Sequence, residues 1–209
     1  MNKIRREARQ AIKKDEDFAI TQELREKYHG HDQPESRRIE WDDCFMSIAF
    51  ILSMRSLDPS TKCGAVVVSC ERDILSVGYN SPPRGCDDKK IPLTRPEKYD
   101  FMSHAEENCI VNASRIGTSL KDSTIYITSY PCERCFRMIR NAGIKKIVYF
   151  SGNSNQCIHA STLSSIDLMN RDEEGNIHVI IEEYKKSNNS ITESFDLVLD
   201  YLKKKNAID

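Results

Sequence analysis

The chain has 209 residues, 39% of them hydrophobic and 30% charged, and this length predicts one core-forming domain with additions rather than two domains. Its formal net charge of −1 at pH 7 lacks the basic excess of a dedicated nucleic-acid binder. With no apolar run of about 18 residues and no secretory signal at the first residues, we expect a cytoplasmic protein that has no membrane partner.

Residues 1–38 are highly charged and predict an N-terminal arm outside the folded domain. Ile4, Ala8 and Ile12 recur at helical spacing among basic residues, which is typical of a short amphipathic helix. A solvated arm or an oligomer contact is favoured over a nucleic-acid contact. We expect the folded domain at 39–209, which divides into a core at 41–150 and a C-terminal extension at 151–209.

Hydrophobic patterning predicts an α/β fold. Helices are expected at 41–57, 103–116, 131–141, 158–169 and 190–205. Strands are expected at 65–68, 74–77, 124–128, 146–150 and 177–181. The first two strands are joined by a polar turn, so they predict an antiparallel hairpin that opens a mixed five-stranded sheet with helices on both faces. The long connection at 80–102 is typical of a functional loop.

Two short motifs contain the residues best suited to chemistry, His104-Ala105-Glu106 and Pro131-Cys132-Glu133-Arg134-Cys135. A catalytic zinc ion takes three protein ligands and keeps a fourth position for water, and His104, Cys132 and Cys135 supply such a set. The two cysteines are three residues apart at the start of a predicted helix, which places both sulfurs on one side. A helix N-terminus also favours the thiolate form. The motifs therefore predict Zn²⁺ as a cofactor.

Glu106 distinguishes a catalytic zinc site from a structural one. It lies two residues after a candidate ligand, within reach of the open position on the metal. Zinc lowers the pKa of water toward neutrality, and a carboxylate there can move protons from that water to a substrate. Either motif alone also fits a redox pair or a structural zinc site, but the two together favour catalysis.

With these motifs, the sequence resembles the cytidine/deoxycytidylate deaminase superfamily, and within it the dCMP deaminases. The resemblance extends over 41–150, about half of the chain. Its further segments are Asp58–Val67, Gly78–Ser81, Pro83–Asp88, Arg95–Tyr99 and Gly143–Val148. The H-x-E and P-C-x-x-C motifs are the signature of zinc base deaminases.

This resemblance implies a cytidine-deaminase-like three-layer sandwich that deaminates a free deoxynucleotide, dCMP, to dUMP and ammonia. Glu106 would be the catalytic proton shuttle. Asn80 would contact the sugar, the backbone at Ala105 would approach the pyrimidine carbonyl, and Pro131 would belong to the substrate site. The resemblance also implies a homo-oligomer and allosteric control by dCTP and dTTP. Candidates for phosphate or effector contacts are Lys62, Arg84, Gly85, Cys86 and Arg95.

Two alternatives stay open. The same zinc chemistry can act on cytosine or adenosine in a nucleic acid, or on a modified nucleotide, although the net charge does not favour nucleic acid. A chain of this kind can also be a catalytically silent zinc-binding interaction module. The intact Glu106 argues against the silent module.

Overall fold

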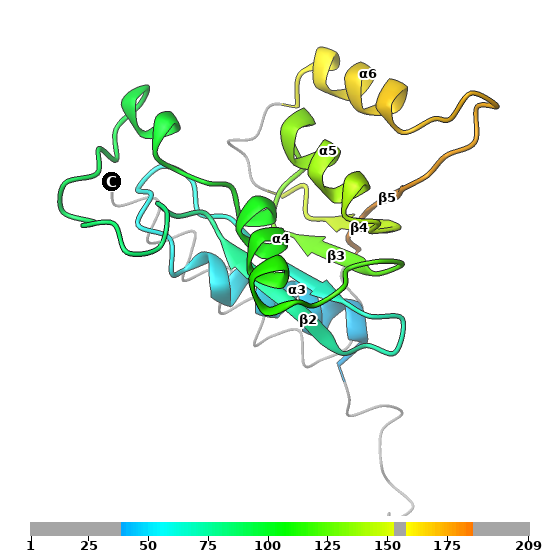
Figure 1. Cartoon of the computed structure of the whole chain (residues 1–209), viewed down its shortest axis with the longest axis horizontal. Coiled ribbons are helices and arrows are strands. Elements are labelled where there is room, and N and C mark those ends of the chain that lie inside the picture. The colour runs from blue at the N-terminus through cyan, green and yellow to red at the C-terminus, as the bar shows by residue number, and fades with distance from the viewer. Residues whose placement is uncertain (1–38, 153–157, 186–209) are drawn as a thin grey trace, which may run out of the picture. The chain divides into compact units, whose positions relative to one another are not determined.

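The structure is a computed structural model that describes residues 39–152 and 158–185 (Figure 1). The predicted arm at 1–38 and the predicted closing helix at 190–205 lie outside the described residues. Among the described helices, none is both long enough and apolar enough to cross a membrane.

The centre of the fold is a five-stranded sheet with strand order β2-β1-β3-β4-β5. The strands are β1 (Gly64–Val68), β2 (Ile74–Tyr79), β3 (Thr124–Ile127), β4 (Lys146–Tyr149) and β5 (Ile180–Glu183). β1 pairs antiparallel with both β2 and β3, whereas β3, β4 and β5 run parallel. The predicted mixed sheet opened by an antiparallel hairpin is therefore confirmed.

Helices cover both faces of this sheet, as the sequence predicts (Figure 1). The helical elements are α3 (Trp41–Ser53), a 3-10 turn η1 (Glu97–Asp100), α4 (Ala105–Ile116), α5 (Glu133–Asn141) and α6 (Ala160–Met169). α4, α5 and α6 pack on one face, and α3 packs on the other. The three layers follow from β1, because Ala65 and Val67 contact the first group of helices while Val66 and Val68 contact α3.

Several predicted boundaries were wrong by a few residues. α3 ends at Ser53 rather than at 57, because the backbone N–H groups of residues 54–56 bond to carbonyls three residues earlier instead of four. α6 begins at Ala160 rather than at 158.

α4 begins at Ala105 rather than at 103, because Ser103 forms an isolated bridge with Ser81. α5 begins at Glu133 rather than at 131 and has Cys132 as its N-cap. β5 begins three residues later than predicted. The Asn170 amide hydrogen-bonds the Val179 backbone N–H and carbonyl, both at 2.8 Å, so regular pairing starts only after Val179.

Gly78 lets β2 lie directly against the first turns of α4. A Cβ at this position would lie 2.3 Å from the Ala105 carbonyl oxygen and 2.5 Å from the Cys109 backbone nitrogen. Because backbone rather than a flexible side chain is in the way, we expect Gly78→Ala to displace the start of α4. Overpacking of this kind costs about 1–3 kcal/mol, and urea denaturation should show a loss in that range.

Gly175→Ala is a suitable control, because Gly175 has open space around it and a φ of +84°. It should lose about 1–2 kcal/mol, because alanine at this positive φ carries backbone strain. It should leave the start of α4 in place. Equal stability of Gly78→Ala and the wild type would contradict the close approach of β2 to α4.

Candidate active site

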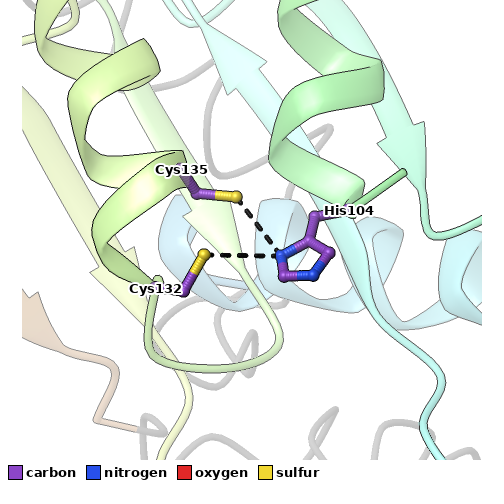
Figure 2. A group of neighbouring side chains, drawn as sticks. All are labelled: His104, Cys132 and Cys135. Carbon is purple, nitrogen blue, oxygen red and sulfur yellow. Dashed lines mark hydrogen bonds between the residues drawn. The ribbon is translucent and has the colours of Figure 1, made fainter. Parts of the chain in front are cut away.

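His104, Cys132 and Cys135 come together although they belong to two different helices (Figure 2). Their candidate ligand atoms all lie within 4.8 Å of one another. His104 Nδ1 faces both sulfurs, at 3.6 Å from Cys132 Sγ and 3.4 Å from Cys135 Sγ. The structure thus assembles the three residues that the sequence predicts as zinc ligands.

These separations fit a tetrahedral zinc ion. Zinc binds cysteine sulfur at about 2.3 Å and histidine nitrogen at about 2.0–2.1 Å, so tetrahedral angles place the two kinds of atom about 3.5 Å apart. The observed distances of 3.4 and 3.6 Å bracket that value. A set of one imidazole and two thiols is also a donor set that zinc prefers.

Hydrogen bonds among the three groups favour the form of cysteine that binds metal. The Cys135 thiol and the His104 ring lower the pKa of Cys132 to about 4. The bond to Cys132 in turn raises the pKa of His104 to about 9. The pKa of Cys135 is raised by its bond to Cys132 and by burial. Cys132 is therefore a thiolate at neutral pH, and a thiolate is the ligand form for zinc.

Each candidate ligand is placed by the start of a helix. His104 is the N-cap of α4, and Cys132 is the N-cap of α5. The residue before His104, Ser103, exchanges two backbone hydrogen bonds with Ser81 at 2.9 and 3.1 Å. This bridge ties the residue before His104 to the start of the loop that follows β2.

Glu106 lies in the first turn of α4 and is only 3% exposed. Burial raises the pKa of this carboxyl above its usual range, although the charge on His104 opposes the shift. A raised pKa favours the protonated form, so a buried carboxyl of this kind is suited to donate a proton as well as to accept one. The position next to three candidate metal ligands suits that chemistry.

A cavity of about 210 Å³ opens beside these residues. It is lined by His104, Ala105, Glu106 and Cys132, which belong to the two motifs, and by Asn80 and Arg95. Pro131 is buried next to Cys132 and is not among the lining residues.

The side chain of Asn80 lines the cavity and also hydrogen-bonds the neighbouring backbone. Its Oδ1 accepts a hydrogen bond from the Cys63 backbone N–H at 2.8 Å, and its Nδ2 donates to the Thr61 carbonyl at 2.9 Å. The amide therefore fixes the backbone of 61–63, which forms part of the cavity wall.

The wall of the cavity also contains a buried ion pair that sequence reasoning missed. Lys98 Nζ lies 2.6 and 2.8 Å from the two carboxylate oxygens of Asp58, and both residues are less than 5% exposed. Asp58 Oδ1 also accepts from the backbone N–H groups of Ser60 and Thr61. The pair joins η1 to the loop before β1, and both partners lie in segments of the sequence that resemble the deaminases.

Removal of one partner should destabilise the fold strongly. Lys98→Met leaves the Asp58 carboxylate buried without its counter-ion, and breaking a buried pair in this way typically costs about 3–5 kcal/mol. We expect a loss in that range by urea denaturation. The double variant Asp58→Asn/Lys98→Met is the control, and it should recover most of the loss. A single variant as stable as the wild type would contradict the buried pair.

The same pair predicts how stability depends on pH. Burial raises the pKa of Asp58, but the hydrogen bonds from Lys98 and Ser60 outweigh burial and hold it below its ordinary value of 3.8. A depressed pKa stabilises the fold at neutral pH, and this contribution is lost as the pH falls through the folded-state pKa. The free energy of unfolding should therefore fall more steeply below about pH 4 in the wild type than in Asp58→Asn. If the free energy of unfolding fell equally steeply with pH in the wild type and in Asp58→Asn, the depressed pKa of Asp58 would be contradicted.

The five candidates for phosphate or effector contacts do not form one site. Arg95 lines the cavity beside Glu106, and its guanidinium donates to Thr61 Oγ1 at 3.2 Å. Arg84, Gly85 and Cys86 line a second cavity of about 280 Å³. Lys62 lines neither cavity, and its ammonium group donates to the Ser56 carbonyl.

Comparison with known proteins agrees with this geometry. The family described as the cytidine and deoxycytidylate deaminase zinc-binding region matches residues 39–151, which is more than half of the chain. The chain belongs to this family. The match includes both motifs, so the family and the donor set of His104, Cys132 and Cys135 agree on zinc as the fitting metal.

Relatives within the family include named enzymes. The deoxycytidylate deaminase of Homo sapiens is 37% identical over 119 residues, which cover 54% of this chain and 66% of that protein. The probable deoxycytidylate deaminase of Drosophila melanogaster is 35% identical over 133 residues, which cover 56% of this chain and 64% of that protein. The chain thus spans slightly less than two thirds of the length of these curated relatives.

A solved structure supports the same fold. The dCMP deaminase from the cyanophage S-TIM5, solved in complex with dCMP and dUMP, is 25% identical in sequence to this chain. It matches with a TM-score of 0.52 over 74% of this chain and all of that one. The predicted cytidine-deaminase-like fold is therefore confirmed.

Proposed function

We propose that the chain catalyses the hydrolytic deamination of dCMP to dUMP and ammonia. The observation that carries this proposal is the convergence of His104, Cys132 and Cys135 next to the buried Glu106, at a cavity of about 210 Å³. Membership of a family whose named relatives are deoxycytidylate deaminases supports the choice of substrate. The cyanophage enzyme solved with dCMP and dUMP supports it further.

In this proposal Glu106 moves the protons. When held by His104, Cys132 and Cys135, a zinc ion makes water a stronger nucleophile at neutral pH. Glu106 accepts a proton from the attacking water and delivers it to N3 of the cytosine ring. It then passes the second proton to the amine, so that a C–O bond forms at C4, the C–N bond breaks and ammonia leaves. Burial of Glu106 keeps bulk water away from these transfers.

The other cavity residues would orient the nucleotide. The buried backbone at Ala105 would lie near the pyrimidine carbonyl, Pro131 would support that part of the site, and Asn80 would contact the sugar. Arg95 would bind the phosphate. Asp58 already neutralises Lys98 in this wall, whereas Arg95 is exposed and contacts a hydroxyl and the Tyr99 ring.

The second cavity is our candidate for nucleotide control. Arg55 and Arg84 line it, and two guanidinium groups suit the phosphates of an effector such as dCTP or dTTP. We also expect a homo-oligomer, because Val111 and Ile116 of α4 are 52% and 63% exposed. Both statements extend the proposal beyond the catalytic site.

The test is a substrate panel with zinc-loaded protein: dCMP, CMP, dCTP, deoxycytidine and single-stranded DNA, each with and without added dCTP or dTTP. We expect loss of the cytosine absorbance with dCMP. Arg95→Gln should raise KM for dCMP more than it lowers kcat. Turnover of single-stranded DNA alone would favour the nucleic-acid alternative, and silence on every substrate would contradict the proposal.

A further inference from the structure

An ion pair outside the ligand set joins the two helices that bear the ligands. Arg134 of α5 donates from a guanidinium nitrogen to Glu107 Oε1 of α4 at 2.7 Å. The Glu107 side chain is 17% exposed and the Arg134 side chain 67%. Neither residue lines the cavity beside Glu106 or the second cavity, so the proposed chemistry leaves the pair without a role.

The pair is placed where it controls the spacing of the ligands. Glu107 lies one helical turn after His104, and Arg134 stands between Cys132 and Cys135. His104 reaches the site from the start of α4, whereas both cysteines reach it from the start of α5. The distances from the histidine nitrogen to the sulfurs, 3.4 and 3.6 Å, therefore depend on how the two helix starts lie relative to each other.

Electrostatic repulsion between the two helix starts opposes this spacing. Each helix N-terminus carries a partial positive charge, and here two of them point toward one proposed cation site. Like partial charges push the helix starts apart. The helix dipole favours Glu107 in the first turn of α4, but it disfavours Arg134 in the first turn of α5. The ion pair with Glu107 offsets this unfavourable interaction of Arg134 with the dipole of α5. It also adds an attraction between the starts of α4 and α5.

We propose that Glu107 and Arg134 are positioning residues, which hold α4 and α5 at the spacing that zinc binding requires. This inference rests on the proposed zinc site, and it concerns affinity for the metal rather than proton transfer. Because the pair is partly exposed, its contribution should be modest and sensitive to salt. We expect the loss of either partner to weaken zinc binding about 3- to 10-fold, between the effect of a surface ion pair and that of a residue bonded directly to a ligand.

The experiment measures zinc affinity by competition with a chromogenic chelator. The variants are Arg134→Ala, Glu107→Gln and the charge swap Glu107→Arg/Arg134→Glu. Arg137→Ala is the matched control, because Arg137 is an exposed arginine one turn further along the same helix. The two single variants should bind zinc more weakly. The zinc affinity of the charge swap should return to within about twofold of the wild-type value, and the zinc affinity of Arg137→Ala should equal the wild-type value.

Salt separates a positioning charge pair from a merely structural contact. At about 1 M salt the Debye length is about 3 Å, so the wild type should lose its advantage over the single variants. Equal zinc affinity in all variants at low salt would overturn the positioning role alone. The positioning role would also be overturned if the single variants lost zinc affinity equally at low and high salt and the charge swap did not restore it. A wild type that takes up no zinc would instead overturn the proposed function, and the positioning role with it.

Discussion

Glu106→Gln is expected to lower the turnover of dCMP by at least about 100-fold while the protein keeps its zinc, because general acid–base groups typically contribute 10²- to 10⁴-fold. The amide has nearly the same shape as the carboxyl, but it cannot take up and release a proton. Glu106 does not belong to the three groups that converge as candidate ligands. Ammonia release and metal content, measured on the same sample, check both parts of this result.

Glu71→Gln is the matched control, because Glu71 is an exposed carboxylate in the turn between β1 and β2. It should leave both turnover and zinc content unchanged. If Glu106→Gln kept most of the wild-type rate with zinc bound, Glu106 would not be the proton shuttle.

Cys132→Ser should reduce bound zinc from about one ion per chain to a small fraction and abolish turnover. A serine hydroxyl stays protonated at neutral pH and is a poor zinc ligand, whereas the pKa of Cys132 is held at about 4. Loss of one of the three candidate ligands leaves His104 and Cys135 of the group that the described residues bring together. Elemental analysis after dialysis measures the metal.

Cys70→Ser controls for the chemical change itself, because Cys70 is an exposed cysteine away from the ligand group. Its zinc content should equal that of the wild type. Stoichiometric zinc in Cys132→Ser would show that another residue completes the site.

The sequence predicted the candidate site well where the signal is local. The spacing of His104 to Glu106 and of Cys132 to Cys135 can be read along the chain, and both motifs stand at helix starts. The sheet was predictable for a similar reason, since its strands are short apolar runs bounded by turns.

Contacts between distant segments could not be predicted in this way. Lys98 and Asp58 are 40 positions apart, and no periodic pattern connects them. The pair of Glu107 and Arg134 depends on how two helices pack. A charged residue in a sequence usually faces solvent, so only the fold reveals which charges meet inside or across a gap.

Local hydrogen bonds explain why β5 and α5 begin later than the sequence predicts. The predicted strand at 177–181 contains apolar residues, but the Asn170 side chain binds the backbone of Val179 and delays the start of β5. Cys132 lies just before α5 rather than within its first turn, because an N-cap keeps an extended backbone while its carbonyl starts the helix. Such choices depend on hydrogen-bond partners that sequence patterns do not identify.

The most direct test of the proposed function is a titration of metal-free protein with zinc while ammonia release from dCMP is followed. We expect activity to rise in proportion to added zinc and to reach a plateau at about one ion per chain, the stoichiometry of a single three-ligand site. Binding of one zinc ion without ammonia release from dCMP would contradict the proposed deamination.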